Sequence, residues 1–273
     1  MIRAENLSFS YNQKEDVFKD VSFHVKRGEI MAVLGANGIG KTTMMRCMMR
    51  FLSLKTGEVF IDGINTREMN NSQFWKNISY VPQAKNLVFG YTVLNMVVMG
   101  RSQHVKFGYT PSKEEYERAY ELLEEIGLSH LAHRSCNSIS GGQLQMVLIA
   151  RALIKEPDIL IMDEPESNLD MKNQLKVLEI MEKISRERNV TVIINTHYPE
   201  HALRYTDKTL ILGRGSYVFD DSDKAITKEN IYKYFSVNAS IYDVEEDGQR
   251  YKGILPISYH EEHNLKSEMK TVV

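Results

Sequence analysis

Residues 35–43 read Gly35-Ala36-Asn37-Gly38-Ile39-Gly40-Lys41-Thr42-Thr43. They fit the phosphate-loop pattern G-x-x-x-x-G-K-[ST], in which glycines let backbone N–H groups turn toward phosphate oxygens at a helix N-terminus. The flanks agree, because residues 29–34 form a mostly apolar run suited to a buried strand and residues 43–50 contain no helix breaker. We expect Lys41 to reach the β- and γ-phosphates of a nucleotide, the Thr42 hydroxyl to ligate Mg²⁺, and Thr43 to lie near the α-phosphate.

Two later apolar runs end in polar residues that suit the same chemistry. Asp163 and Glu164 follow residues 159–162, and His197 comes two residues after the run 191–195. Parallel strands bind ligands at their carboxyl ends, so these side chains and the phosphate loop should share one edge of a sheet. We expect Asp163 to hold Mg²⁺, Glu164 to orient or deprotonate a water molecule, and His197 to sense the γ-phosphate. A solvated strand end explains one acid easily, and the adjacent pair less well.

Three further features are weak signals when each is taken alone. Gln83 follows a strand-like run that Pro82 stops, and Tyr11 ends an alternating strand ahead of the phosphate loop. Residues 140–143 read Ser140-Gly141-Gly142-Gln143 and begin a predicted helix, where Ser140 is a good N-cap and the glycines leave N–H groups open to an anion. The ordinary alternatives are a polar loop residue for Gln83, an aromatic residue of a sheet for Tyr11, and a plain capping turn for residues 140–143.

Composition excludes some classes of protein. The 273 residues hold 34 Lys plus Arg against 36 Asp plus Glu, and the formal net charge of -2 gives no support for a nucleic-acid binder driven by bulk charge. The two cysteines, Cys47 and Cys136, have no metal-binding spacing and indicate reduced thiols. No apolar run approaches the ~18–20 residues of a membrane helix, so we expect a soluble chain whose membrane role comes through a partner.

The predicted secondary structure changes in two regions after the phosphate loop. From about residue 87 to 157 it becomes helical, with a capping box at Ser112 and Glu115 and a helix that Gly127 closes. Residues 228–235 then predict a helix, and residues 243–251 predict a hairpin around an Asp-Gly turn.

Taken in order, these segments resemble the ATP-binding-cassette (ABC) ATPases over essentially the whole chain. The segment 140–143 is the most specific part, because it separates this family from other phosphate-loop NTPases. The resemblance implies an α/β fold: a P-loop NTPase (RecA-like) core with an N-terminal antiparallel β subdomain and an inserted helical subdomain. One domain, 1–273, would then comprise the core (1–86 and 158–240), the helical subdomain (87–157), and a C-terminal hairpin and tail (241–273).

The resemblance also implies a role for each matching residue. ATP and Mg²⁺ would be the cofactors, with Glu164, His197 and Gln83 catalytic and Thr42, Gln83 and Asp163 at the metal. Tyr11 would stack on adenine, and residues 140–143 and Asp170 would act across the interface with a second copy. The implied nucleotide-contacting set is Tyr11, Gly35, Asn37, Gly38, Gly40, Lys41, Thr42, Thr43, Ser140, Gly141, Gly142, Gln143 and Asp170.

A narrower resemblance concerns the transported substrate. Residues 90–101, 196–202 and 226–231 look like the corresponding segments of importers of iron-siderophore, haem and cobalamin type. This implies transmembrane permease subunits and an extracytoplasmic substrate-binding protein as partners, no nucleic acid, and a peripheral location on the cytoplasmic face of the membrane. Two residues depart from the family pattern: Ile139 replaces the usual Leu, and Glu166 stands where a small or hydroxyl residue is usual.

Three other classes of protein share parts of this pattern. A soluble ABC ATPase of translation or repair usually carries two cassettes or a long coiled coil, and neither occurs here. A phosphate-loop kinase would not account for residues 140–143 or His197. An exporter ATPase is harder to exclude, because the direction of transport is not written in the cassette.

Overall fold

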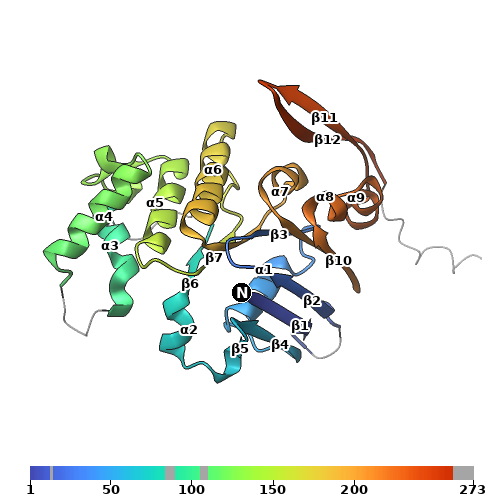
Figure 1. Cartoon of the computed structure of the whole chain (residues 1–273), viewed down its shortest axis with the longest axis horizontal. Helices are drawn as coiled ribbons and strands as arrows, with labels where there is room; N and C mark the ends of the chain where they lie inside the picture. Colours follow the sequence, from blue (N-terminus) through green and yellow to red (C-terminus); the bar gives the residue numbers. More distant parts are fainter. Residues whose placement is uncertain (13–14, 84–89, 105–109, 261–273) are drawn as a thin grey trace, which may run out of the picture.

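The computed structural model describes residues 1–12, 15–83, 90–104 and 110–260 (Figure 1). Its centre is a six-stranded sheet in the order β10-β9-β3-β8-β7-β6, in which all neighbours except β10 and β9 run parallel. The strands are β3 (Ile30–Gly35), β6 (Ile78–Val81), β7 (Ile159–Asp163), β8 (Thr191–Asn195), β9 (Lys208–Gly213) and β10 (Ser216–Asp221). The expected end of the core segment at residue 86, the start of the helical subdomain at residue 87 and the tail after residue 260 lie outside the described residues.

A second, antiparallel sheet packs beside the first. Its order is β2-β1-β4-β5, formed by β1 (Ile2–Phe9), β2 (Phe18–Val25), β4 (Thr56–Ile61) and β5 (Ile64–Asn65). Tyr11 was expected at the end of a strand, but β1 stops at Phe9 and leaves Tyr11 in the connection to β2.

Helices cover both faces of the central sheet, as fully apolar parallel strands require. Side chains of β3 alternate between two buried clusters: Ile30, Ala32 and Leu34 face the helical side, whereas Met31 and Val33 face α1 and the antiparallel sheet. The helices are α1 (Lys41–Met48), α2 (Asn71–Asn77), α3 (Val93–Val98), α4 (Lys113–Glu125), α5 (Gly141–Leu153), α6 (Met171–Arg188), α7 (Pro199–Tyr205), α8 (Ser222–Ala225) and α9 (Lys228–Phe235), with 3₁₀ turns at Thr66–Glu68, Met99–His104, Ser129–Leu131 and Cys136–Ser138. None of these described helices combines the length and the apolarity that crossing a bilayer requires.

The capping signals in the sequence set several helix boundaries. Ser112 and Glu115 form the predicted capping box of α4, and Ser140 is the predicted N-cap of α5, where the Gln143 side chain completes a second capping box. The hairpin around the Asp247-Gly248 turn is confirmed: β11 (Val237–Glu246) pairs with β12 (Gln249–Tyr259), and both turn residues have positive φ. Because β11 begins at Val237, the expected boundary between core and hairpin at residues 240 and 241 falls inside this strand. Figure 1 shows this hairpin extending away from the central sheet beside α7 and α9.

Candidate active site

The phosphate loop has a backbone that requires glycine. Gly35 and Gly40 have φ values of 143° and 112°. A Cβ on Gly35 would lie 2.6 Å from the Leu212 carbonyl oxygen, and one on Gly40 would lie 2.4 Å from Val17 Cγ1. Gly40 caps α1 without a side-chain hydrogen bond, so the first N–H groups of that helix have no side-chain cap competing for them. The arrangement suits an anion at the start of α1.

Lys41 is buried within this loop. Its ammonium donates to the carbonyl oxygens of Gly35 at 2.8 Å and Ala36 at 3.2 Å, and it lies 3.3 Å from Nδ1 of His197. Burial lowers the pKa of Lys41 to about 8, while the charges of Glu164 and Asp163 act in the opposite direction. A cation held this way is ready to exchange weak carbonyl partners for phosphate oxygens.

Asp163 is the centre of a second set of contacts, at the end of β7. Its Oδ1 accepts from the Thr42 hydroxyl at 3.2 Å and from Asn195 Nδ2 at 2.6 Å, and its Oδ2 accepts from the Tyr80 hydroxyl at 3.2 Å. Burial, followed by the charge of Asp163, raises the pKa of Tyr80 to about 12, so the phenol stays protonated as a donor. Sequence reasoning missed Tyr80 and Asn195. Both lie at or near strand ends on the edge where a site was expected, and that position was the available signal.

This set suits Mg²⁺. Within the described ranges, no group of three or more His, Cys, Asp or Glu side chains is arranged so that it could hold a metal ion by itself. Magnesium keeps several waters and binds through one or two protein oxygens plus substrate phosphates, which is what Thr42 and Asp163 offer.

Glu164 and His197 face each other across the edge of the sheet. Oε1 of Glu164 lies 2.5 Å from Nε2 of His197, and the Ser167 hydroxyl donates to Oε2 at 3.2 Å. Because the Lys41 ammonium can only donate, Nδ1 of His197 accepts from it and Nε2 carries the proton toward Glu164. Glu164 also has a positive φ of 49°, a conformation uncommon for a residue with a side chain. The structure thus joins Lys41, His197 and Glu164 in one chain of contacts.

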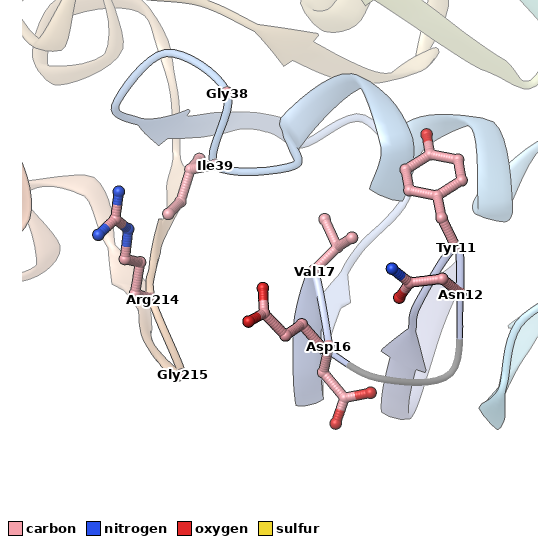
Figure 2. Close-up of a pocket in the computed structure, with 9 residues that line it drawn as sticks. Tyr11, Asn12, Asp16, Val17, Gly38, Ile39, Arg214 and Gly215 are labelled. Atoms are coloured by element: carbon pink, nitrogen blue, oxygen red, sulfur yellow. The ribbon is translucent and has the colours of Figure 1, made fainter.

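Tyr11 stands at the mouth of this site. Its side chain is 65% exposed, its hydroxyl lies 3.0 Å from Thr43 Oγ1, and its ring meets Phe9 edge-on. A cavity of about 650 Å³ is lined by Tyr11, Val17, Asn37, Gly38, Gly40, Lys41, Thr42, Thr43, Glu164 and His197. A neighbouring cavity shares Tyr11, Val17 and Gly38, and Figure 2 shows it between Tyr11, Asn12 and Asp16 on one side and Ile39 and Arg214 on the other.

The remaining expected residues lie elsewhere. Gln83 lies two residues beyond β6 and is partly exposed, outside the described lining of the 650 Å³ cavity. The segment 140–143 caps α5 and is also outside that lining. A Cβ on Gly141 would meet nothing within 4 Å, whereas one on Gly142 would lie 2.5 Å from Asn173, which Asp170 holds through two hydrogen bonds.

The sequence profile of the family described as ABC transporter matches residues 18–167, more than half of the chain. The chain belongs to the ABC transporter family. It has the fold expected of such ATPases, with the antiparallel β subdomain beside the P-loop core, and it is an ATPase whose hydrolysis of ATP drives transport.

Individual ABC proteins are also similar to this chain in sequence and in structure. The molybdate import ATP-binding protein MolC of Haemophilus influenzae is 34% identical over 234 residues, covering 86% of this chain and 87% of its own. The structure of a metal-chelate type ABC transporter in an inward-facing conformation is similar with a TM-score of 0.84 and 31% identity, covering 94% of this chain and 97% of its own. A dimeric ATP-binding cassette bound to ADP and Pi after hydrolysis has a TM-score of 0.69 and 28% identity, covering 81% and 99%.

Proposed function

We propose that the chain is the ATP-hydrolysing subunit of an ABC importer, bound to the cytoplasmic face of the membrane through transmembrane permease subunits. The observation that carries this proposal is the connected set of Lys41, His197 and Glu164 beside the Thr42–Asp163 pair, at the N-terminus of α1. It supplies cationic, hydroxyl and carboxylate groups in the places that phosphoryl transfer to water needs.

In the proposed reaction, Glu164 accepts the proton of the attacking water, and His197 holds that carboxylate in place. Lys41 leaves the carbonyls of Gly35 and Ala36 and neutralises phosphate charge. Mg²⁺ held by Thr42 and Asp163 would neutralise the developing charge on the phosphates. The nucleoside would extend toward Tyr11, whose exposed ring is free to stack on adenine.

The site is completed by a second copy. The segment 140–143 presents a helix N-terminus outside the described lining of its own chain's cavity, and Gly141 has open space above it. Two copies placed head to tail would each offer this N-terminus to the ATP on the other, and the family includes a dimeric cassette. Hydrolysis would remove the shared ligand and open the pair, so ATP drives a bistable interface.

The proposed cargo is a metal chelate of the iron-siderophore, haem or cobalamin type, delivered by an extracytoplasmic binding protein. Support comes from the importer-like segments 90–101, 196–202 and 226–231 and from the likeness to the metal-chelate type transporter. The molybdate importer among the relatives names a competing cargo. Purification of the intact complex, with mass spectrometry of what its binding protein holds, decides between a chelate and an oxyanion.

Substitution Glu164→Gln tests the reaction. It keeps the size of the side chain and removes the base, so turnover should fall by about 10²–10⁴-fold, the usual contribution of general base catalysis, while ATP still binds. Steady-state phosphate release and equilibrium ATP binding measure the two effects. The exposed Glu121→Gln on α4 is the matched control and should change neither. Normal turnover in Glu164→Gln would remove Glu164 from the role of base.

A further inference from the structure

A second carboxylate and imidazole lie behind the first pair. Glu166 is fully buried, and neither of its carboxylate oxygens has a hydrogen-bond partner within the described part of the chain. Nδ1 of His201 lies 3.9 Å from Oε1 of Glu166, and it too is buried with no hydrogen-bond partner among the described residues. The two groups face each other about 1 Å beyond hydrogen-bond distance.

The pair Glu166–His201 joins the same two segments as the pair Glu164–His197. Both carboxylates belong to residues 164–170, which connect β7 to α6 and end at the N-cap Asp170. Both histidines follow β8, and His201 lies on α7 directly after the segment that carries His197. Both pairs therefore link residues 164–170 to the segment that runs from the end of β8 into α7.

Each partner is held from its own side. The Glu166 carbonyl accepts from Leu169 N at 3.3 Å and from Gln174 Nε2 at 3.4 Å, which fixes its backbone to the turn before α6. The His201 ring packs against Tyr198, with ring centroids 4.7 Å apart. Movement of residues 164–170 against α7 would change the distance between Glu166 and His201, and it would also change how Glu164 faces His197.

Stability alone does not explain this pair. A buried carboxylate without a hydrogen bond is unfavourable, and apolar residues of similar volume often replace buried ionic pairs at no loss of stability. A link that is nearly made, beside a catalytic carboxylate, instead suits a contact that closes when the two segments approach.

We propose that Glu166 and His201 are positioning residues for ATP hydrolysis. Their hydrogen bond, once closed, clamps residues 164–170 to α7 and keeps Glu164 facing His197 while Asp170 meets the second copy. The inference rests on the proposed function, because it takes Glu164 as the base. Neither residue belongs to the described lining of the 650 Å³ cavity.

The decisive variant is the double substitution Glu166→Met with His201→Leu, which replaces the pair with apolar side chains of similar size. We expect a melting temperature at or above that of the unchanged protein, a KM for ATP within about twofold, and a kcat reduced by about tenfold. Glu200→Gln, an exposed substitution on the same helix, is the control and should leave all three unchanged. A double variant that folds and keeps kcat within about twofold would overturn the proposal.

If the double variant does not fold, two single substitutions decide. His201→Asn keeps an N–H donor near the position of Nδ1, and His201→Leu keeps only volume. We expect kcat of His201→Asn to stay within about threefold of the unchanged protein and kcat of His201→Leu to fall by about tenfold. Equal kcat values for the two variants would contradict a positioning hydrogen bond.

The Glu164→Gln measurement separates this inference from the proposed function. Normal turnover in Glu164→Gln removes the base on which both depend. Loss of turnover there, together with normal kcat in the Glu166 and His201 variants, rejects only the positioning role.

Discussion

The helices α1 and α5 both begin at a glycine-rich turn, yet the two N-termini have different surroundings. At α1, glycines 35, 38 and 40 wrap a loop that buries Lys41, and the ends of β7 and β8 bring Asp163, Glu164 and His197 against it. At α5, Ser140 and Gln143 cap the helix with their own side chains, and Gly141 faces open space.

Under the proposed function, this difference means that one chain holds only half of a working site. The α1 terminus has its reacting groups within reach in the same chain. The α5 terminus has a stable cap and a helix dipole, and in the proposed dimer it contacts the ATP that is bound by the second copy. Changes at α1 should therefore act on ATP binding or chemistry in each copy, and changes at α5 should act only where two copies meet.

The largest effect that would separate the two termini is expected from Gly141→Asp. A Cβ there would meet nothing within 4 Å in the described part of its own chain, so ATP binding by the single subunit should stay within about twofold. The added carboxylate would repel the phosphates of the second copy, and turnover should fall by at least about 100-fold, as for the loss of a preorganised oxyanion donor. Asn137→Asp adds the same charge at an exposed position nearby and is the control. Weakened ATP binding by the isolated Gly141→Asp subunit would break the comparison.

The sequence predicted which residues gather at the α1 terminus, but it did not predict the hydrogen bonds between them. The motif identified Lys41 and Thr42, and the apolar runs placed Asp163, Glu164 and His197 at one edge, because strand ends are readable from hydrophobic patterns. The hydrogen bonds of Tyr80 and Asn195 to Asp163 could not be read, because they depend on the parallel register of β6, β7 and β8.

Glu166 is a second residue whose contacts could not be predicted from the sequence. Its departure from the family pattern was visible in the sequence, but its complete burial and its approach to His201 depend on the packing of the turn against α7. The fold itself was predictable as a family resemblance, and the capping box of α4, the Ser140 N-cap of α5 and the Asp-Gly hairpin were predictable from local residues alone.

A smaller effect is expected at the α1 site from Tyr11→Leu. Loss of the ring should weaken ATP binding by about 5–10-fold, since aromatic stacking contributes about 1 kcal/mol beyond buried area. Tyr11→Phe keeps the ring and removes only the hydroxyl contact to Thr43, so it should bind ATP within about twofold of the unchanged protein. Isothermal titration with the isolated subunit measures both. Equal losses in the two variants would assign the effect to the hydroxyl instead.

The smallest effect concerns how α5 is attached to the core. Lys155 follows α5, and its ammonium donates to the carbonyl oxygens of Trp75 and Ile78 at the α2–β6 junction. Burial lowers the pKa of Lys155 from 10.5 to about 8. Between pH 8 and 10.5 the unfolded chain holds a proton that the folded chain has released, so this residue makes stability rise with pH over that window.

In Lys155→Met the increase in unfolding free energy between pH 8 and 10.5 should be smaller by about 1 kcal/mol, allowing for partial exposure of the side chain. This corresponds to a difference of roughly 2–4 °C in the rise of Tm. Thermal melts at pH 7.5 and pH 10 measure it, with the exposed Lys172→Met as the control. An unchanged pH slope would show that the ammonium is not held at this junction.

The most direct test of the central claim, that each working site combines the α1 terminus of one copy with the α5 terminus of another, is a mixing experiment. Lys41→Met and Gly141→Asp are each expected to be inactive alone. Mixed in equal amounts, half of the dimers should pair the two variants, and each such dimer would hold one intact site. ATPase activity should therefore recover to about a quarter of that of the unchanged protein. Activity in the mixture no higher than in either variant alone would contradict the account.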